Sequence, residues 1–156
     1  MFNMIQRIQT LYLFSALVLT ILLFFLPLAE IITVNNQLLL FKSSGLYDTE
    51  AGEIIIRTAP LIILIAVITF LYFIAIFLFK RRVVQARVCM LNILLHAGLT
   101  GLLIYYLTFI YRKVEMSGSG IQLAVLFPVI SMILTYMAYR SIHRDEKLVR
   151  SADTIR

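Results

Sequence analysis

Four stretches of the chain are apolar enough and long enough to cross a lipid bilayer as helices. They are 19 to 24 residues long and contain no Asp, Glu, Lys or Arg: Ile8–Leu28, Pro60–Phe79, Val88–Tyr111 and Ile121–Tyr139. A helix rises 1.5 Å per residue, so about 20 residues span a hydrocarbon core of about 30 Å. The pattern therefore predicts an all-α membrane protein with four transmembrane helices.

The segment between the first two apolar stretches has a different pattern. Two runs of residues that favour β-strands, Ile31–Val34 and Gln37–Phe41, are separated by Asn35 and Asn36. Asparagine tolerates the left-handed backbone conformations that a two-residue hairpin turn requires. We therefore predict a small β-hairpin in residues 31–41, close to the membrane surface and outside the cell.

The second half of the chain has a short connection and a charged end. Residues 112–120 end in Ser-Gly-Ser-Gly, which predicts a tight loop, and Pro128 predicts a bend inside the fourth helix. Residues 140–156 contain no Gly or Pro, so we expect the fourth helix to continue as a cytoplasmic extension of a single domain, residues 1–156. One edge of this extension is apolar and is either a partner-docking surface or a solvated helix end: Leu148, Val149, Ala152 and Ile155.

Composition and charge support this arrangement. The chain is 62% hydrophobic and only 14% charged, whereas soluble domains are about one quarter charged. Of its 14 Lys and Arg residues, ten lie on the side that holds both termini and four on the other side. The positive-inside rule then places both termini in the cytoplasm. The net charge of +6 is thereby explained by topology, and no basic folded face that would bind nucleic acid is visible.

The third apolar stretch has the most polar side chains. Cys89, Asn92, His96 and Thr100 follow each other at steps of three, four and four, so they share one face of a helix. Asn92, His96 and Thr100 form a candidate intramembrane polar face. Its functional interpretation is a ligand, quinone or proton site around His96. The alternative is a set of hydrogen bonds between helices that fixes their packing.

The sequence gives little support for a disulfide, a metal or haem site, or a catalytic site. The single cysteine excludes an intramolecular disulfide and a thiolate metal cluster, and no nucleophile lies near a base. A haem held by two histidines would need a second membrane histidine, but His143 lies beyond the fourth stretch. We expect no enzyme activity, no metal and no cofactor.

Three short motifs add a resemblance to a known family. They are MIQRIQTLYL at Met4–Leu13, GLYD at Gly45–Asp48 and RDEKLVRSADTIR at Arg144–Arg156. The chain resembles a family of small four-span inner-membrane proteins from Bacteroidetes, classed as a domain of unknown function. The resemblance implies four spans and a bacterial inner (cytoplasmic) membrane, and it implies no activity, ligand or catalytic residue.

Together these observations favour a non-enzymatic accessory or scaffold subunit. Its partners would be the lipid bilayer and other membrane proteins or a second copy of itself, without nucleic acid. The alternative is a small-molecule facilitator or ligand-binding membrane protein that uses the face of Asn92, His96 and Thr100.

Overall fold

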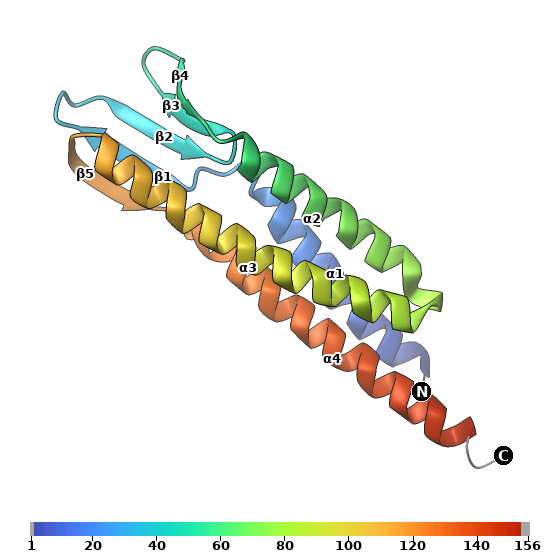
Figure 1. The fold of residues 1–156 in the computed structure, drawn as a ribbon. Coiled ribbons are helices and arrows are strands. Elements are labelled where there is room, and N and C mark those ends of the chain that lie inside the picture. The colour runs from blue at the N-terminus through green and yellow to red at the C-terminus, as the bar shows by residue number, and fades with distance from the viewer. Residues whose placement is uncertain (1, 154–156) are drawn as a thin grey trace.

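The computed structural model describes the backbone of residues 2–153 and the side chains of residues 8–79 and 81–144. Four long helices lie side by side and a β-sheet lies at one end of them (Figure 1). We call this end the sheet end. At the opposite end, the terminal end, α1 begins, α4 ends and α2 connects to α3.

The helices are α1 (Phe2–Leu22), α2 (Ala59–Phe77), α3 (Arg82–Lys113) and α4 (Phe127–Asp153). Each packs against two neighbours, because α1 and α3 both contact α2 and α4. Among the described residues, α2, α3 and the segment Leu123–Arg144 are long and apolar enough to cross a membrane, and Ile8–Leu22 is a shorter apolar helix. The chain is therefore mostly helical, with three to four helices that suit a membrane.

Two helix ends differ from the predicted ones. The first helix ends at Leu22 rather than Leu28, because the backbone N–H of Leu28 donates to the carbonyl of Phe41 in the sheet, at 2.7 Å. The third helix begins at Arg82 rather than Val88, after a short 3₁₀ turn at Leu78–Lys80. The basic segment before Val88 contains no Gly or Pro and is helical from Arg82 onward.

The fourth helix also begins later than predicted. Residues 116–121 form a strand and Leu123–Leu126 form a 3₁₀ turn, so α4 begins only at Phe127. Pro128 thus lies in the first turn, where a helix has no use for its missing N–H. The predicted bend inside the fourth helix was wrong. At its other end α4 continues without a break through residues 140–153.

The sheet has five antiparallel strands, so the mostly helical fold is as predicted but its β-structure is larger than the one predicted hairpin. The strands are β1 (Ala29–Thr33), β2 (Leu38–Lys42), β3 (Gly45–Asp48), β4 (Ile54–Arg57) and β5 (Met116–Ile121), in the spatial order β4-β3-β2-β1-β5. The predicted hairpin in residues 31–41 is present as β1 and β2, where Ile31 pairs with Leu39.

The turn of this hairpin is one residue longer than predicted. Asn36 alone has a left-handed backbone, with φ of 59°, and its N–H donates to the carbonyl of Thr33 at 3.0 Å. The N–H of Thr33 in turn donates to the carbonyl of Gln37 at 3.0 Å. This arrangement is a three-residue loop, Val34–Asn36, which ends in a left-handed residue.

The two faces of the sheet have different environments. One face belongs to the core that continues into the helices, with Ala29, Ile31, Leu39, Phe41 and Leu46 all buried. The other face, which we call the outer face, carries exposed apolar side chains. Ile32 and Leu38 pair across β1 and β2, and Ile54 pairs with Tyr47 across β4 and β3.

Hydrogen bonds connect the sheet to the helices. Thr58, which precedes α2, is buried, and its hydroxyl donates to the carbonyl of Ser43 between β2 and β3, at 2.8 Å. The N–H of Gln122, which follows β5, donates to the carbonyl of Leu28 at 2.9 Å. The Thr58 bond therefore fixes the sheet to the start of α2, and the Gln122 bond joins the connections that lead from α1 into β1 and from β5 toward α4.

A glycine in the sheet gives the first prediction. Gly45 has φ of +155°, and a Cβ there would overlap the backbone carbonyl oxygen of Ile56 on the neighbouring strand. We expect Gly45→Ala to destabilise the folded protein by about 1–3 kcal/mol, measured as a lower midpoint in thermal unfolding in mild detergent. Gly118→Ala is the matched control, because a Cβ there meets nothing within 4 Å. Equal midpoints for both variants would contradict the strand geometry.

Candidate functional site

One face of α3 brings polar side chains into the interior of the helices. Cys89, Asn92 and His96 have no exposed surface. Thr100 is only half-buried, and its hydroxyl donates within α3 to the carbonyl of His96 at 2.8 Å. The structure thus gathers three of the four residues of the polar stripe in the interior and places Thr100 at its margin.

His96 has contacts with two other helices. Its Nδ1 lies 2.9 Å from the carbonyl oxygen of Asn92, and its Nε2 lies 3.4 Å from the hydroxyl of Thr20 on α1. Its ring and the ring of Tyr72 on α2 make an edge-to-face contact, with centroids 5.6 Å apart and planes inclined at 63°. A carbonyl oxygen only accepts hydrogen bonds, so Nδ1 must be the donor to Asn92. A neutral His96 then presents the lone pair of Nε2 to Thr20.

The hydroxyl of Thr20 has a choice of acceptors. It lies 2.8 Å from the carbonyl oxygen of Ala16 and 3.4 Å from His96 Nε2. One hydroxyl carries one hydrogen, so with a neutral His96 the hydroxyl bonds one of these acceptors at a time. The shorter distance favours Ala16. The contact between His96 and α1 is therefore weak, and the ring is held chiefly by its own helix and by Tyr72.

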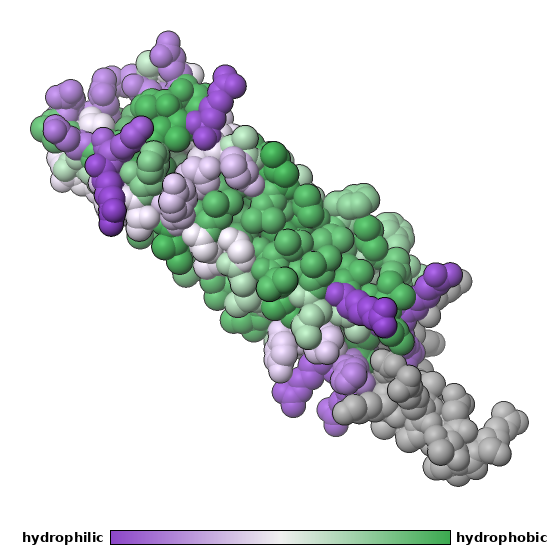
Figure 2. All heavy atoms as spheres, in the orientation of Figure 1, coloured by the Kyte–Doolittle hydropathy of each residue, from purple (hydrophilic) through white to green (hydrophobic). Residues whose placement is uncertain are grey.

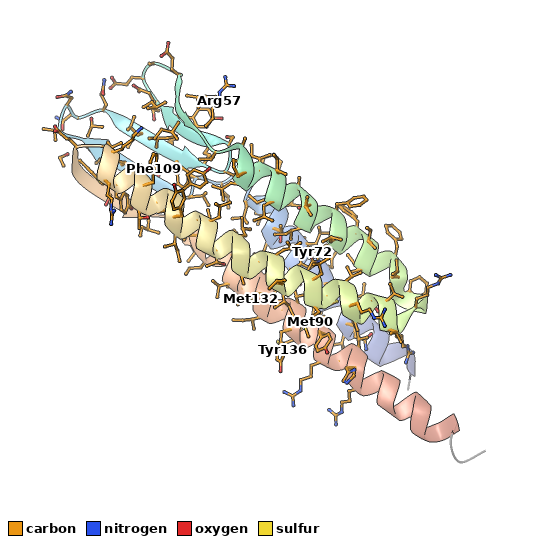
Figure 3. The ribbon with its side chains drawn as sticks, in the orientation of Figure 1. Arg57, Tyr72, Met90, Phe109, Met132 and Tyr136 are labelled. Atoms are coloured by element: carbon orange, nitrogen blue, oxygen red, sulfur yellow. The ribbon has the colours of Figure 1, made fainter. Side chains whose placement is uncertain are left out.

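Among the described residues, Tyr72 makes the shortest polar contact between helices. Its hydroxyl lies 2.6 Å from the hydroxyl of Thr135 on α4, and Thr135 donates in turn to the carbonyl of Ser131 at 2.6 Å. Because that bond uses the one hydrogen of Thr135, Tyr72 is the donor in the first contact. Ser131 donates to the carbonyl of Ala16 on α1 at 3.4 Å. Tyr72 lies within the group of helices, as its label in Figure 3 shows.

Six buried polar side chains therefore come together from all four helices. We call this group the polar layer: Thr20, Tyr72, Asn92, His96, Ser131 and Thr135. Each of the six has an exposed fraction of 0%. The layer contains no carboxylate and no lysine or arginine. Its geometry suits hydrogen bonds that hold helices together, which contribute about 1 kcal/mol each in a membrane.

Asn92 is the exception within the polar layer. Neither the Oδ1 nor the Nδ2 of its side chain has a hydrogen-bond partner in the part of the chain that the structure describes. A buried amide without partners costs about 1–3 kcal/mol of stability. Asn92 is thus the one member of the layer whose side chain lowers the stability of the fold.

A second set of polar contacts lies nearer the terminal end. The side-chain amide of Gln85 on α3 donates to the carbonyl of Ala75 on α2 at 2.9 Å. The amide of Gln9 on α1 lies 3.4 Å from the hydroxyl of Ser141 on α4. Both glutamines are buried. Each therefore adds a bond between neighbouring helices away from the polar layer.

The sequence pattern did not identify several of these residues. The pattern does not single out Thr20, Tyr72, Ser131 or Thr135, although the structure buries all four and places Thr20 and Tyr72 against His96. A signal was present on α4, because Ser131 and Thr135 are four residues apart and share a helix face. Tyr72 had no partner on its own helix to reveal it.

The remaining candidates lie away from the layer. His143 stacks on Tyr139 with ring centroids 6.0 Å apart, on the exposed surface near the terminal end. Leu148, Val149 and Ala152 fall within α4, but their side chains lie outside the described residues, as does all of Ile155. Among the described residues no three His, Cys, Asp or Glu side chains gather where they would bind a metal.

Comparison with known proteins identifies the class of protein to which this fold belongs. The model of the family "Domain of unknown function (DUF4293)" matches residues 5–155. This range includes the whole sheet and all four helices, apart from the first residues of α1. The chain belongs to this family. No curated protein and no solved structure matches the chain.

The two buried amides of α3 give a matched prediction. Replacing Asn92 with leucine removes an unpartnered amide, so we expect Asn92→Leu to raise the free energy of unfolding by about 1–2 kcal/mol. Replacing Gln85 with methionine removes a formed bond to Ala75, so we expect Gln85→Met to lower it by about 1 kcal/mol. Thermal unfolding in detergent measures both. A lower midpoint for Asn92→Leu would show that its amide has a partner in the folded protein.

Proposed function

We propose that the chain is an integral protein of a bacterial inner membrane and a non-enzymatic accessory or scaffold subunit that binds other membrane proteins. In this proposal α1, α2, α3 and α4 cross the membrane as a four-helix bundle. Both termini are cytoplasmic, and the sheet lies on the exterior side.

The surface of the molecule supports the membrane part of the proposal. Figure 2 shows a hydrophobic surface along the middle of the helices, with hydrophilic residues gathered at the sheet end and at the terminal end. Large apolar side chains are exposed on this band, among them Phe70, Phe73 and Leu94. A water-soluble chain would not expose so continuous an apolar surface. The apolar part of α1, Ile8–Leu22, is about 22 Å long, and the apolar residues 23–28 continue from it toward the sheet.

The distribution of charge supports the orientation. The terminal end has a basic segment at and before the start of α3, including Arg81, Arg82 and Arg87, and the basic end of α4. The sheet and its loops together contain five of the eight acidic residues, among them Asp48, Glu50 and Glu53. Basic residues favour the cytoplasmic side of an inner membrane.

The outer face of the sheet is the observation that carries the scaffold role. Its exposed apolar side chains, Ile32, Leu38 and Ile54, are 43%, 37% and 42% exposed although they lie outside the apolar band. Tyr47 and Leu40 lie beside them in the register of the strands. An apolar face of this kind on a polar end of a protein is typical of a protein–protein contact. By contrast, the polar side chains of the helices bond mainly to backbone carbonyls of the helices.

The alternative of a small-molecule facilitator or ligand-binding protein ranks second. The unpartnered amide of Asn92 favours it, because that group would bind a polar ligand. However, Asn92 and His96 have no exposed surface, so a ligand would reach them only if the helices separated. His96→Ala is the test, since the alternative requires it to reduce ligand uptake or binding while expression is unchanged.

Topology can be tested with single cysteines in a Cys89→Ser background. We expect a membrane-impermeant maleimide to label Thr49→Cys, in a loop of the sheet, in intact spheroplasts. Arg144→Cys, on α4 near the terminal end, should react only after the membrane is permeabilised. The opposite pattern of labelling, or release of the protein by an alkaline wash without detergent, would contradict the proposed arrangement.

The scaffold role can be tested by crosslinking at the outer face. A photoreactive residue in place of Leu38 should crosslink to another membrane protein in the native host, whereas one in place of Glu50, in the loop beside β3, should not. The same partner should co-purify with the unmodified chain and be lost with Ile32→Asp, because burying a carboxylate in an apolar contact is costly. Crosslinks to a second copy alone, or none, would count against the scaffold role.

A further inference from the structure

A shallow groove follows the surface of α3 from the terminal end toward its middle. It has a volume of about 530 Å³ and is lined by Arg87, Met90, Leu91, Ile93, Leu94 and Ala97. Arg87 is the only charged member, and it lies at the end of the lining nearest the terminal end. A smaller groove of about 320 Å³ between α3 and α4 shares Arg87 and Met90 with it. Met90, labelled in Figure 3, lies where the two grooves join.

The length of the apolar lining matches one leaflet of a membrane. From Arg87 to Ala97 the helix advances ten residues, or about 15 Å. This distance is about half the thickness of a hydrocarbon core of about 30 Å. An acyl chain that begins level with Arg87 would therefore reach the middle of the membrane near Ala97.

The charge at the mouth of the groove matches a phosphate. Arg87 is exposed, and its guanidinium makes no ion pair or hydrogen bond with any residue that the structure describes. A guanidinium presents a planar fork of donors that fits phosphate oxygens. The smaller groove next to it is lined by the stacked rings of Tyr139 and His143, which leaves room for a head group between α3 and α4.

We propose that this site binds one anionic phospholipid from the leaflet at the terminal end. Its phosphate lies against Arg87, its head group occupies the groove beside Tyr139, and one acyl chain follows α3 past Leu94 to Ala97. The inference rests on the proposed function, because it requires the helices to cross a membrane.

Native mass spectrometry of the full chain in mild detergent tests the site. The probes are dioleoyl phosphatidylglycerol and dioleoyl phosphatidylcholine, which have the same acyl chains and differ in net charge. We expect the unmodified protein to retain phosphatidylglycerol in preference to phosphatidylcholine. Arg87→Gln should weaken retention of phosphatidylglycerol about fivefold, the effect of one basic residue on an anionic lipid.

Two further variants separate the explanations. Arg112→Gln removes an exposed positive charge from the other end of α3 and should leave lipid retention unchanged. Leu94→Trp fills the groove while keeping Arg87, and it should weaken retention of phosphatidylglycerol as well. If only Arg87→Gln weakens retention of phosphatidylglycerol, and Leu94→Trp does not, the arginine attracts anions in general and the groove binds no acyl chain. Equal retention of the two lipids by the unmodified protein would also overturn the site. So would equal effects of Arg87→Gln and Arg112→Gln. A chain that the topology experiment places in the membrane and that shows no preference would refute the lipid site alone.

Discussion

The bond between Tyr72 and Thr135 is the interaction on which the arrangement of the helices most depends. It joins α2 to α4, two helices that are not neighbours in the ring of contacts, and it passes through the centre of the group. Apolar side chains alone would let the helices rotate or slide against one another, since lipid is as good a solvent for them as a neighbouring helix. A hydrogen bond between two fixed positions removes that freedom. Ser131 extends the constraint to α1 through the carbonyl of Ala16, and the ring contact between Tyr72 and His96 extends it to α3.

The same layer shows why polar residues in an apolar chain are not by themselves a functional site. His96 has its Nδ1 bound to its own helix, its ring against Tyr72 and no exposed surface. A group enclosed in this way fixes geometry without contact to any ligand. Only Asn92 departs from this rule, because it occupies an interior position and pairs with nothing that the structure describes. A cost of this kind is normally removed by selection unless the residue serves some other state of the protein.

The sequence was sufficient for the helices and insufficient for the sheet, and the reasons are physical. A long apolar run such as Pro60–Phe79 is typical of a helix in an apolar environment. The number and approximate position of the helices could therefore be predicted. The predicted hairpin at residues 31–41 had both strand-forming residues and asparagines in its turn. By contrast, β5 pairs through its backbone, and its sequence, MSGSGI, has no alternating apolar pattern to report the pairing. The polar stripe on α3 could be predicted because all of its residues lie on one helix at helical spacing. The contact between Tyr72 and Thr135 could not be predicted, because the two residues are 63 positions apart and spacing within one helix says nothing about contacts with another helix.

The pairing of β1 with β5 has a consequence for the order of assembly. Ile32 pairs with Gly118, so the strand that completes the sheet is synthesised long after the other four. While α2 and α3 are being made, β1 has an open edge whose backbone groups lack a partner on one side. An open edge of an apolar strand is a template for pairing with other chains. Until β5 is made, this apolar edge is open, and β5 then replaces it with an edge whose sequence, MSGSGI, is rich in Ser and Gly.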